Sequence, residues 1–308
     1  MEGRVLRTTG LQCLVLAQGD TWLCQLRGRL KFGPQRTNAP LVAGDLVQIA
    51  QTEAGKGVVE QVHPRVSKIS RVASGSKPFE QVLAANIDRF IVIVAVKSPK
   101  VRPGFIDRAL IVAMKNGIHP VLCFNKMDLG LSYSVEMIAQ LYKTLGYQVI
   151  FTSTQTDGGL DELKDVLSGG VSALVGQSGV GKSSLINCID PSLKLKTQTM
   201  MQKHDRGRHT TTVVQLHMLM AGGFVADTPG LKELEPWGME LGDLDQFFKE
   251  MQPFSGECRF RNCRHLHEPG CAVLNAVDEG IITAVRFGSY QRFREELMQK
   301  GNHERTIY

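Results

Sequence analysis

The chain has 308 residues, of which 43% are hydrophobic and 21% are charged. This length predicts two or three domains, the composition excludes wholesale disorder, and no apolar run approaches the roughly 20 residues of a membrane-spanning helix. The net charge is +6, and residues 1–72 alone hold ten basic and five acidic residues, so the positive charge is concentrated there.

This concentrated positive charge favours nucleic acid as a partner, although clustered charge can also serve solubility alone. Residues 1–72 alternate short apolar segments with turn-forming residues, and strands are expected at 3–7, 11–16, 21–26, 45–50 and 57–62. Five short strands predict an OB-type β-barrel that binds RNA, with an SH3-like barrel as the alternative. A predicted loop groups basic and aromatic side chains, as nucleic-acid-binding grooves do: Arg27, Arg29, Lys31 and Phe32.

The polar segment 71–80 contains Gly, Ser and Pro and is predicted to be a linker. Beyond it, strands alternate with helices, which predicts a doubly wound α/β sheet in a domain of residues 73–235. The expected strands are 89–96, 120–124, 148–152 and 171–175, and the expected helices are 106–116, 135–145 and 160–167. Residues 236–308 form a third predicted domain, with helical patterns at 273–283 and 290–299.

The strand expected at 120–124 runs into Asn125-Lys126-Met127-Asp128, which matches the pattern N-K-x-D. The Asp128 carboxylate can accept hydrogen bonds from N1–H and the exocyclic amine of guanine, whereas adenine would leave a buried carboxylate unpaired. Asn125 is expected either to bind the base or to brace a phosphate-binding loop, and the Lys126 stem is expected to cover the ring. The pattern therefore predicts a guanine site, provided that a phosphate-binding loop lies beside it.

A glycine-rich loop with the pattern G-x-x-x-x-G-K-S follows the strand expected at 171–175, and a helical pattern follows the loop. Its backbone N–H groups are expected to wrap phosphates, and the helix N-terminus adds a favourable dipole. Lys182 is expected to reach the β- and γ-phosphates, and Ser183 to bind Mg²⁺. The predicted nucleotide-binding residues of this loop are Gly176, Gln177, Ser178, Gly179, Val180, Gly181, Lys182, Ser183 and Ser184.

Asp227-Thr228-Pro229-Gly230 follows an expected strand at 223–226 and fits the D-x-x-G pattern of GTPases. The Asp227 carboxylate is expected to hold Mg²⁺ through water, and the Gly230 N–H to meet the γ-phosphate. Thr211 is favoured as the residue that closes over Mg²⁺ and the γ-phosphate. Its neighbours Thr210 and Thr212 are alternatives, and the threonine run also fits an ordinary strand start.

Leu231 stands after Gly230, where GTPases often carry a glutamine that orients the attacking water. Leucine cannot make this hydrogen bond, so slow intrinsic hydrolysis is expected unless another residue or a partner supplies the function. His209 is the candidate catalytic residue for that role, together with Lys182 and Thr211, and the alternative for His209 is a solvated loop histidine.

The motifs stand in an unusual order, because N-K-x-D at 125 precedes the phosphate loop at 176. In ordinary GTPases the phosphate loop comes first. Since all the parts are present, the order predicts a circularly permuted P-loop GTPase domain, which compact domains with neighbouring termini tolerate. The D-x-x-G motif then ends the domain, and nucleotide state is expected to reposition the segment that follows.

Three cysteines and one histidine near the C-terminus have the spacing C-x4-C-x-H-x5-C. Three thiolates and one imidazole suit a structural zinc site without an open position, and few apolar residues precede residue 272, so zinc is expected to supply much of the local folding free energy. The predicted ligands are Cys258, Cys263, His265 and Cys271, with His267 as the alternative to His265. Arginines between the ligands either face RNA phosphates or are solvated: Arg259, Arg261 and Arg264. The other cysteines are interpreted as packing residues: Cys13, Cys24, Cys123 and Cys188.

With these motifs in this order, the chain resembles the RsgA family of bacterial ribosome small subunit-dependent GTPases over essentially its whole length. The resemblance rests on NKMD, GQSGVGKSSL, GRHTTT and DTPG, followed by the zinc pattern. It implies an N-terminal OB barrel, a slow GTPase stimulated by the small ribosomal subunit, and late subunit maturation with release of an assembly factor. One departure is the second base-contacting loop, often S-A-x, where residues 152–155 read TSTQ and only Ser153 and the backbone carry over.

The expected partners are the small ribosomal subunit with its rRNA, assembly factors on the subunit, and GTP or GDP. The expected cofactors are one structural zinc and magnesium with GTP, in a cytoplasmic monomer without membrane association. Three alternatives stay open: a GTPase for another RNA or translation step, a nucleotide-gated binding module, and an ATP-using P-loop kinase. Leu231 keeps the binding module open, and Asp128 argues against the kinase.

Overall fold

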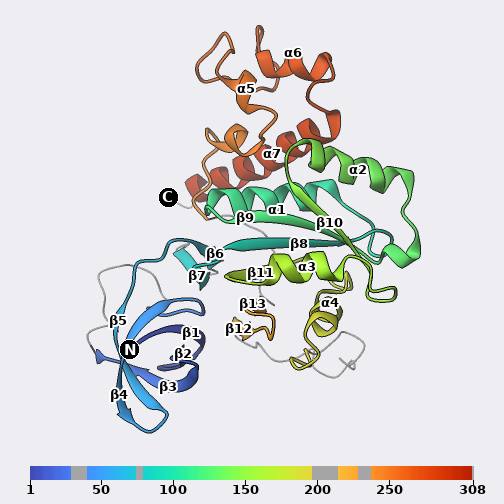
Figure 1. Cartoon of the computed structure of the whole chain (residues 1–308). Coiled ribbons are helices and arrows are strands. Elements are labelled where there is room, and N and C mark those ends of the chain that lie inside the picture. The colour runs from blue at the N-terminus through green and yellow to red at the C-terminus, as the bar shows by residue number, and fades with distance from the viewer. Residues whose placement is uncertain (29–39, 74–78, 196–213, 228–236, 307–308) are drawn as a thin grey trace.

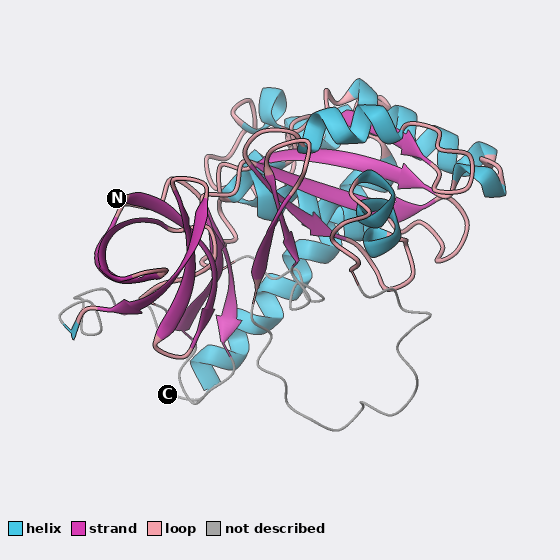
Figure 2. Cartoon of the chain, turned by 60° about the horizontal axis from the view of Figure 1, so that its bottom comes forward, coloured by secondary structure: helices cyan, strands magenta, loops and turns pink. Residues whose placement is uncertain are grey.

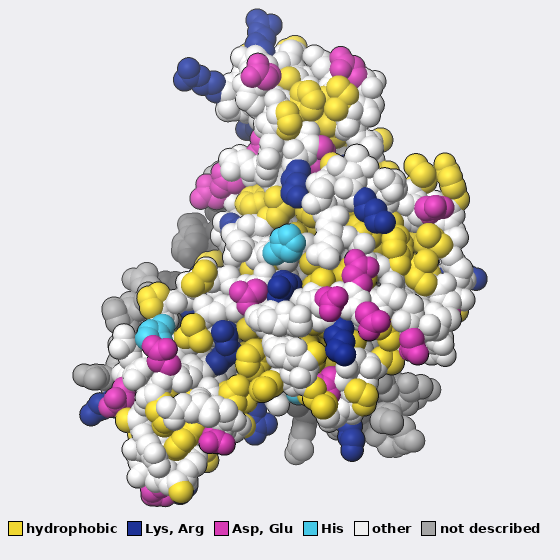
Figure 3. Space-filling view, viewed as in Figure 1, with side chains coloured by type: hydrophobic (Ala, Val, Ile, Leu, Met, Phe, Trp, Pro, Cys, Tyr) yellow, Lys and Arg dark blue, Asp and Glu magenta, His cyan; other side chains and the backbone are white. Residues whose placement is uncertain are grey.

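The computed structural model describes residues 1–28, 40–73, 79–195, 214–227 and 237–306. Figure 1 shows three parts in succession: a β-barrel near the N-terminus, a central α/β sheet, and a helical region that carries the last residues. In Figure 2 the barrel curls on itself beside the central sheet. Figure 3 shows acidic and basic side chains interspersed over the central part, which fits the near-neutral charge of the chain beyond residue 72.

The predicted five-stranded barrel is confirmed. Its strands are β1 (Glu2–Thr9), β2 (Gln12–Ala17), β3 (Asp20–Leu26), β4 (Leu46–Glu53) and β5 (Lys56–Val62). The ring runs β1-β2-β3-β5-β4 and closes where β4 pairs with β1, and β3 and β5 are its parallel pair. Alternate residues such as Val15, Cys24 and Val59 are buried inside, so each strand's apolar alternation fills the small barrel.

The predicted linker at 71–80 is wrong at both ends, because the chain forms strands there. β6 (Lys68–Ala73) and β7 (Phe79–Ala85) pair as an antiparallel hairpin. Ile69 and Ala84 are fully buried, and at Gly44 an added Cβ would lie 1.9 Å from the Ala85 carbonyl oxygen. Apolar residues on either side of the polar segment therefore pack the hairpin against the barrel, which local composition did not reveal.

The predicted α/β sheet is confirmed, with strand order β10-β9-β8-β11-β13-β12. Its strands are β8 (Arg89–Ala95), β9 (His119–Asn125), β10 (Gln148–Thr152), β11 (Val171–Val175), β12 (Gln215–Met218) and β13 (Phe224–Asp227). Only β12 is antiparallel to its sheet neighbour β13 among these described strands. β12 also pairs with β1 at Gln215 and Arg7, so the barrel and the α/β sheet form one continuous 11-stranded sheet.

Helices cover both faces of the α/β sheet. They are α1 (Pro103–Lys115), α2 (Tyr133–Thr144), α3 (Leu160–Leu167) and α4 (Lys182–Ile189). Alternate residues of β8 enter different cores, because successive side chains of a strand point to opposite faces. Phe90, Val92 and Val94 pack with residues of α1 and α2, whereas Ile91 and Ile93 pack with α3 and α4. The continuous apolar run of β8 thus reflects burial on both sides.

The C-terminal region is helical, as predicted. It contains the short 3-10 helix η4 (Leu244–Phe247) and helices α5 (Gln252–Ser255), α6 (Ala272–Asp278) and α7 (Ala284–Thr306). Its core joins Phe248, Met251 and Tyr290 to Ile111 of α1, so α7 packs on the central domain. No helix among the described residues is long and apolar enough to span a membrane.

Candidate nucleotide site and metal centre

The two predicted nucleotide motifs meet at one edge of the sheet. The motif 125–128 begins at the last residue of β9, the glycine-rich loop follows β11, and β8 lies between these parallel strands. The carboxyl ends of parallel strands share one edge, which is where ligands bind in open α/β sheets. The fold therefore brings together motifs that are about 50 residues apart in the chain.

Two glycines of the phosphate loop lie where no side chain fits. A Cβ at Gly176 would lie 2.4 Å from the Ile93 carbonyl oxygen, and one at Gly181 would lie 2.5 Å from Asn125 Nδ2. Gly181 also has a φ of +99°, which favours glycine. α4 begins at Lys182, whose ammonium donates to the carbonyl oxygens of Gly176 at 2.8 Å and Gln177 at 3.0 Å.

Asn125 connects the two motifs. Its side chain is buried, with 1% exposed, and its Nδ2 donates to the Val180 carbonyl oxygen at 2.8 Å. Its Oδ1 accepts from the Thr152 hydroxyl at 3.0 Å. Of the two roles considered for Asn125, the structure contains the contact that braces the phosphate loop. Cys123 Sγ lies 3.2 Å from the same threonine hydroxyl, and burial raises the pKa of this thiol to about 12, so it remains neutral.

A serine orients the carboxylate that is predicted to read guanine. Ser153 Oγ donates to Asp128 Oδ1 at 2.6 Å and accepts from the backbone N–H of Gln155 at 3.1 Å. Lys126 has a left-handed backbone, and its ammonium donates to the Ser98 carbonyl oxygen at 2.6 Å. The predicted recognition loop is therefore held by side-chain contacts on both sides.

The predicted switch residues are only partly described. Asp227 ends β13 with its backbone opposite Gln215, which places it at the same sheet edge as the phosphate loop. His209, Thr211 and its neighbours Thr210 and Thr212 lie outside the described residues, as do Gly230 and Leu231. Ser183 and Ser184 lie in the first turn of α4, next to the loop.

The four predicted zinc ligands form one compact group. The ligand atoms of Cys258, Cys263, His265 and Cys271 all lie within 4.8 Å of one another. His265 Nδ1 lies 3.3 Å from Cys271 Sγ, and its Nε2 lies 3.5 Å from an Asp245 carboxylate oxygen. Three sulfurs and one imidazole nitrogen suit tetrahedral zinc, and a carboxylate on the second ring nitrogen is typical of metal-binding histidines. The group can hold zinc, and His267 is outside it.

A carboxylate and a phenol fix the loop that carries His265. Glu268 accepts the backbone N–H groups of Leu266 and His267 at 2.9 and 3.1 Å. Burial opposes the charged form, but these backbone donors lower the pKa of Glu268 to about 2. The Tyr290 hydroxyl donates to the Arg264 carbonyl oxygen at 2.9 Å. Sequence reasoning missed Asp245, because only the fold brings it to the cluster. It also missed Glu268, which lies between the predicted ligands.

The remaining cysteines do not all behave as predicted. Cys13, Cys24 and Cys123 are buried, but Cys188 is exposed, so its interpretation as a packing residue is wrong. On α4 the core-facing positions are Leu185 and Ile186, and Cys188 lies off that face.

Comparison with known proteins agrees with these motifs. The family model described as RsgA GTPase matches residues 62–237. A protein of Gemmatimonas aurantiaca named Small ribosomal subunit biogenesis GTPase RsgA is 40% identical over 296 residues, covering 94% of this chain and 95% of that protein. A protein of Moorella thermoacetica with the same name is 37% identical, covering 97% of this chain and 98% of that protein.

Two solved structures are similar over almost the whole chain. The crystal structure of YjeQ from Thermotoga maritima superposes with a TM-score of 0.79 at 35% identity, covering 96% of this chain and 98% of that chain. The crystal structure of YloQ, described as a circularly permuted GTPase, superposes with a TM-score of 0.74 at 28% identity, covering 97% of this chain and 95% of that chain. The likeness extends through the barrel, the α/β sheet and the C-terminal region, and the central domain is a circularly permuted P-loop fold.

Proposed function

This chain belongs to the RsgA GTPase family, and we propose that it binds the small ribosomal subunit and its rRNA and assists late maturation of that subunit. Hydrolysis of GTP to GDP and phosphate is stimulated by the subunit and coupled to release of an assembly factor. The names of the curated relatives, which describe small-subunit biogenesis GTPases, support this function. The protein acts as a monomer in the cytoplasm.

The contact from Asn125 to Val180 is the observation that carries the nucleotide part of the proposal. It fastens the N-K-x-D loop to the phosphate loop, so base recognition and phosphate binding act on one ligand. Asp128, held by Ser153, accepts the two guanine donors and leaves adenine unmatched. GTP rather than ATP is therefore the substrate.

The glycine-rich loop and the first turn of α4 are proposed to bind the phosphates of GTP. Backbone N–H groups of the glycine-rich loop and the Lys182 ammonium bind the β- and γ-phosphates. Ser183 and Asp227, at the same sheet edge, are the proposed magnesium ligands, and bound Mg²⁺ neutralises charge on the phosphates. Thr211 and the Gly230 N–H complete the γ-phosphate site.

His209 is the proposed residue that orients the attacking water, because Leu231 cannot do so. The variant His209→Ala is expected to bind GTP normally but to lose most of the turnover that small subunits stimulate. Steady-state phosphate release, with and without subunits, measures both rates. A stimulated rate equal to that of the unmodified protein would reject the role.

Zinc is proposed to have a structural role in the C-terminal region. The four donors Cys258, Cys263, His265 and Cys271 leave no open position for substrate, so the ion stabilises the fold and takes no part in hydrolysis. The arginines between these ligands are candidates for contact with rRNA phosphates. Arg259 lies over the Phe260 ring at 5.5 Å, an arrangement also compatible with a solvated surface.

Turnover of GTP and ATP, with and without purified small ribosomal subunits, tests the function. We expect slow GTP hydrolysis that small subunits accelerate, no such effect of large subunits, and negligible ATP hydrolysis. Lys182→Ala serves as the inactive control, since it removes the loop's ammonium group. GTP turnover that small subunits leave unchanged would reject the proposed function.

A further inference from the structure

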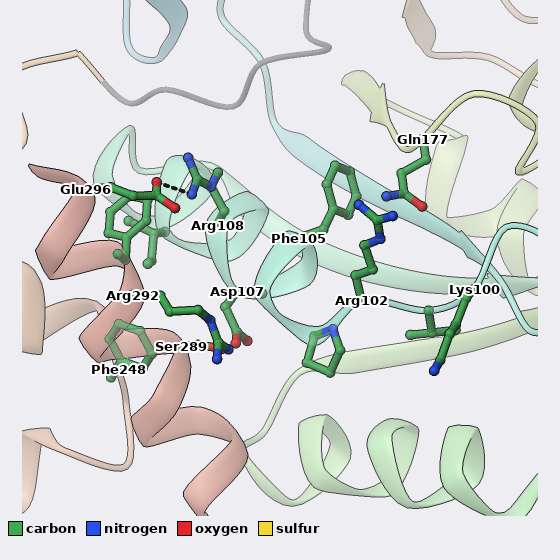
Figure 4. A pocket seen from close by; sticks show the side chains of 15 residues that line it. Lys100, Arg102, Phe105, Asp107, Arg108, Gln177, Phe248, Ser289, Arg292 and Glu296 are labelled. Atoms are coloured by element: carbon green, nitrogen blue, oxygen red, sulfur yellow. Dashed lines mark hydrogen bonds and ion pairs between the residues drawn. The ribbon is translucent and has the colours of Figure 1, made fainter.

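A cavity of about 870 Å³ lies between the central domain and α7 (Figure 4). Its walls are the loop after β8, the first turns of α1 and one face of α7, and it extends to Gln177 of the phosphate loop. We call this cavity the inter-domain groove. The side chains that matter for its chemistry are Lys100, Arg102, Phe105, Asp107, Arg108, Arg292 and Glu296.

The charge in the groove that is not neutralised by ion pairs is positive. Both carboxylates in its walls have cationic partners, since Asp107 pairs with Arg286 and Glu296 pairs with Arg108. Lys100, Arg102 and Arg292 are exposed and have no ion-pair partner among the residues that the structure describes. Three unneutralised cations around one concave surface favour an anionic ligand.

Two of these cations approach from opposite walls. Arg102 stands at the start of α1, whereas Arg292 projects from α7, where its Nη2 donates to the Ser289 hydroxyl at 3.2 Å. The first turn of α1 comes close to Arg292, because a Cβ at Gly104 would lie in van der Waals contact with Arg292 Nη2, at 3.9 Å. The two guanidinium groups therefore belong to different walls of one groove, and a single strand that crosses the groove would meet both.

An aromatic ring lies beside the first of these cations. Figure 4 shows the Phe105 ring next to the Arg102 side chain, on the side of the groove toward Gln177. Phe105 is partly buried against the core of the central domain and also lines the groove. Basic side chains with an adjacent aromatic platform are the usual features of a site for single-stranded nucleic acid, where bases stack and the backbone is neutralised.

We propose that the inter-domain groove binds an unpaired segment of RNA, with phosphates at Arg102, Lys100 and Arg292 and a base stacked on Phe105. A volume of about 870 Å³ is that of a small-molecule pocket and admits individual nucleotides rather than a duplex. The inference rests on the proposed function, because the RNA would be that of the small subunit. RNA in the groove would lie against Gln177, next to the nucleotide.

Binding of a short fluorescein-labelled oligouridylate to the full-length protein, followed by anisotropy over a range of salt concentrations, tests the groove. The double variant Arg102→Ala/Arg292→Ala is expected to bind about tenfold more weakly. The slope of log affinity against log salt concentration is expected to decrease in magnitude by about 1.4, because two phosphate contacts are lost and each contact to a single strand contributes about 0.7. A matched double variant of exposed lysines on α2 and α3, outside the groove lining, Lys143→Ala/Lys164→Ala, should bind as the unmodified protein does.

The variant Phe105→Leu separates the contribution of base stacking from that of phosphate binding. It retains apolar packing, so we expect affinity for the oligouridylate to fall about tenfold while the salt dependence stays unchanged. None of the variants should alter basal GTP turnover, and the two double variants, which change exposed residues, should leave the melting temperature unchanged. With 4-thiouridine in the oligonucleotide, ultraviolet crosslinks should map to residues 97–108 or to α7.

Three results would overturn the proposal: undiminished oligouridylate binding by Arg102→Ala/Arg292→Ala, equal loss of binding to a duplex of the same length, or groove-dependent binding of oligoglutamate instead of RNA. Subunit-stimulated GTP turnover is measured on the same proteins. An unmodified protein that subunits do not stimulate would reject the proposed function, while the oligouridylate data would still decide the groove.

Discussion

The Asp128 carboxylate takes its orientation from the hydroxyl group of Ser153, the residue that directly follows β10. Ser153 is fully buried, and its Oγ donates to Asp128 at 2.6 Å while two backbone N–H groups fix the serine itself. A hydrogen bond to a charged acceptor contributes more than one between neutral groups. The proposed guanine reader is thus a pair of residues rather than Asp128 alone.

Ser153→Ala is expected to weaken GTP binding about tenfold or more. Loss of a hydrogen bond to a charged group costs about 1.5–3 kcal/mol, and here it also frees the carboxylate to rotate. Titration with a fluorescent GTP analogue measures the effect. Ser172→Ala is the matched control, because Ser172 is equally buried but its hydroxyl has no hydrogen-bond partner among the described residues. Equal GTP affinity in the two variants would contradict the assigned role of Ser153.

Asn125→Ala is expected to damage phosphate binding more than base binding. It leaves the Val180 carbonyl oxygen without its side-chain donor and the Thr152 hydroxyl without its acceptor, each at about 1–3 kcal/mol. Affinities for GDP and for guanosine are measured separately. If Asn125 acts as the brace, the GDP affinity falls while the guanosine affinity is nearly retained. An equal loss for both ligands would instead indicate direct contact with the base.

The sequence revealed Asn125 and Asp128 but not their supports, and the reason is physical. Asn125 and Asp128 belong to a four-residue motif that residue type and spacing alone make recognisable. Thr152 becomes a partner of Asn125 only because β9 and β10 pair in a register that sets these two residues opposite each other. That register depends on burial of both strands between helices, which local sequence does not encode.

At the scale of elements, the segment that carries the four proposed zinc ligands contains little regular secondary structure. α5 and α6 have four and seven residues, and between them the chain makes turns around the four ligand atoms. Cys271 also caps α6 by accepting the Leu274 N–H at 3.4 Å. One proposed ligand thus both completes the cluster and starts a helix, so metal binding and the local fold are expected to depend on each other.

Removal of zinc with a chelator is expected to unfold residues 250–275 and to leave nucleotide binding largely intact. Binding of structural zinc supplies about 10–16 kcal/mol in small zinc domains, and the stretch 256–270 that would surround the ion contains few apolar side chains of its own. Hydrogen exchange and a GTP-binding titration follow the two regions. Cys263→Ala should lose the ion, whereas His267→Ala, outside the cluster, should keep it. A folded Cys263→Ala protein with full zinc content would refute the ligand assignment.

The elements that were predicted and those that were missed differ in their physical basis. The helix α3 and the strand β11 were predicted with their correct ends, since apolar periodicity and flanking glycines mark them locally. The hairpin of β6 and β7 was taken for a linker, because its stability comes from packing against Gly44 and Ala43 of the barrel. Elements whose stability depends on contacts distant in sequence are therefore the ones that local patterns miss.

At the scale of the whole molecule, the permuted order gives the C-terminal region its place. β13, the last described strand of the GTPase domain, lies between β11 and β12, and α7 packs back on α1 of that domain. α1 in turn follows the loop beside the phosphate site, and its first turns form one wall of the inter-domain groove. The zinc region is therefore joined to the nucleotide site through α1.

A buried ion network holds this junction. Arg286 of α7 is 1% exposed and bonds to Asp107 of α1 and to Glu250, and its guanidinium lies 4.6 Å from the Phe248 ring centroid and 5.7 Å from that of Tyr142. Burial opposes its charge, but the two carboxylates raise the pKa of Arg286 above its usual value. The network satisfies charges from both sides of the junction.

Arg286→Met is expected to lower the free energy of unfolding by about 3–5 kcal/mol, because it leaves two carboxylates buried without their cation. It should also loosen the docking of α7, so hydrogen exchange in the first turns of α1 rises while that of the barrel does not. Urea denaturation and hydrogen exchange measure these effects. Arg292→Met, six residues further along α7 and exposed, should change stability by less than about 0.5 kcal/mol. Matching exchange rates in α1 for the two variants would show that the helical region is held to the GTPase domain by apolar packing alone.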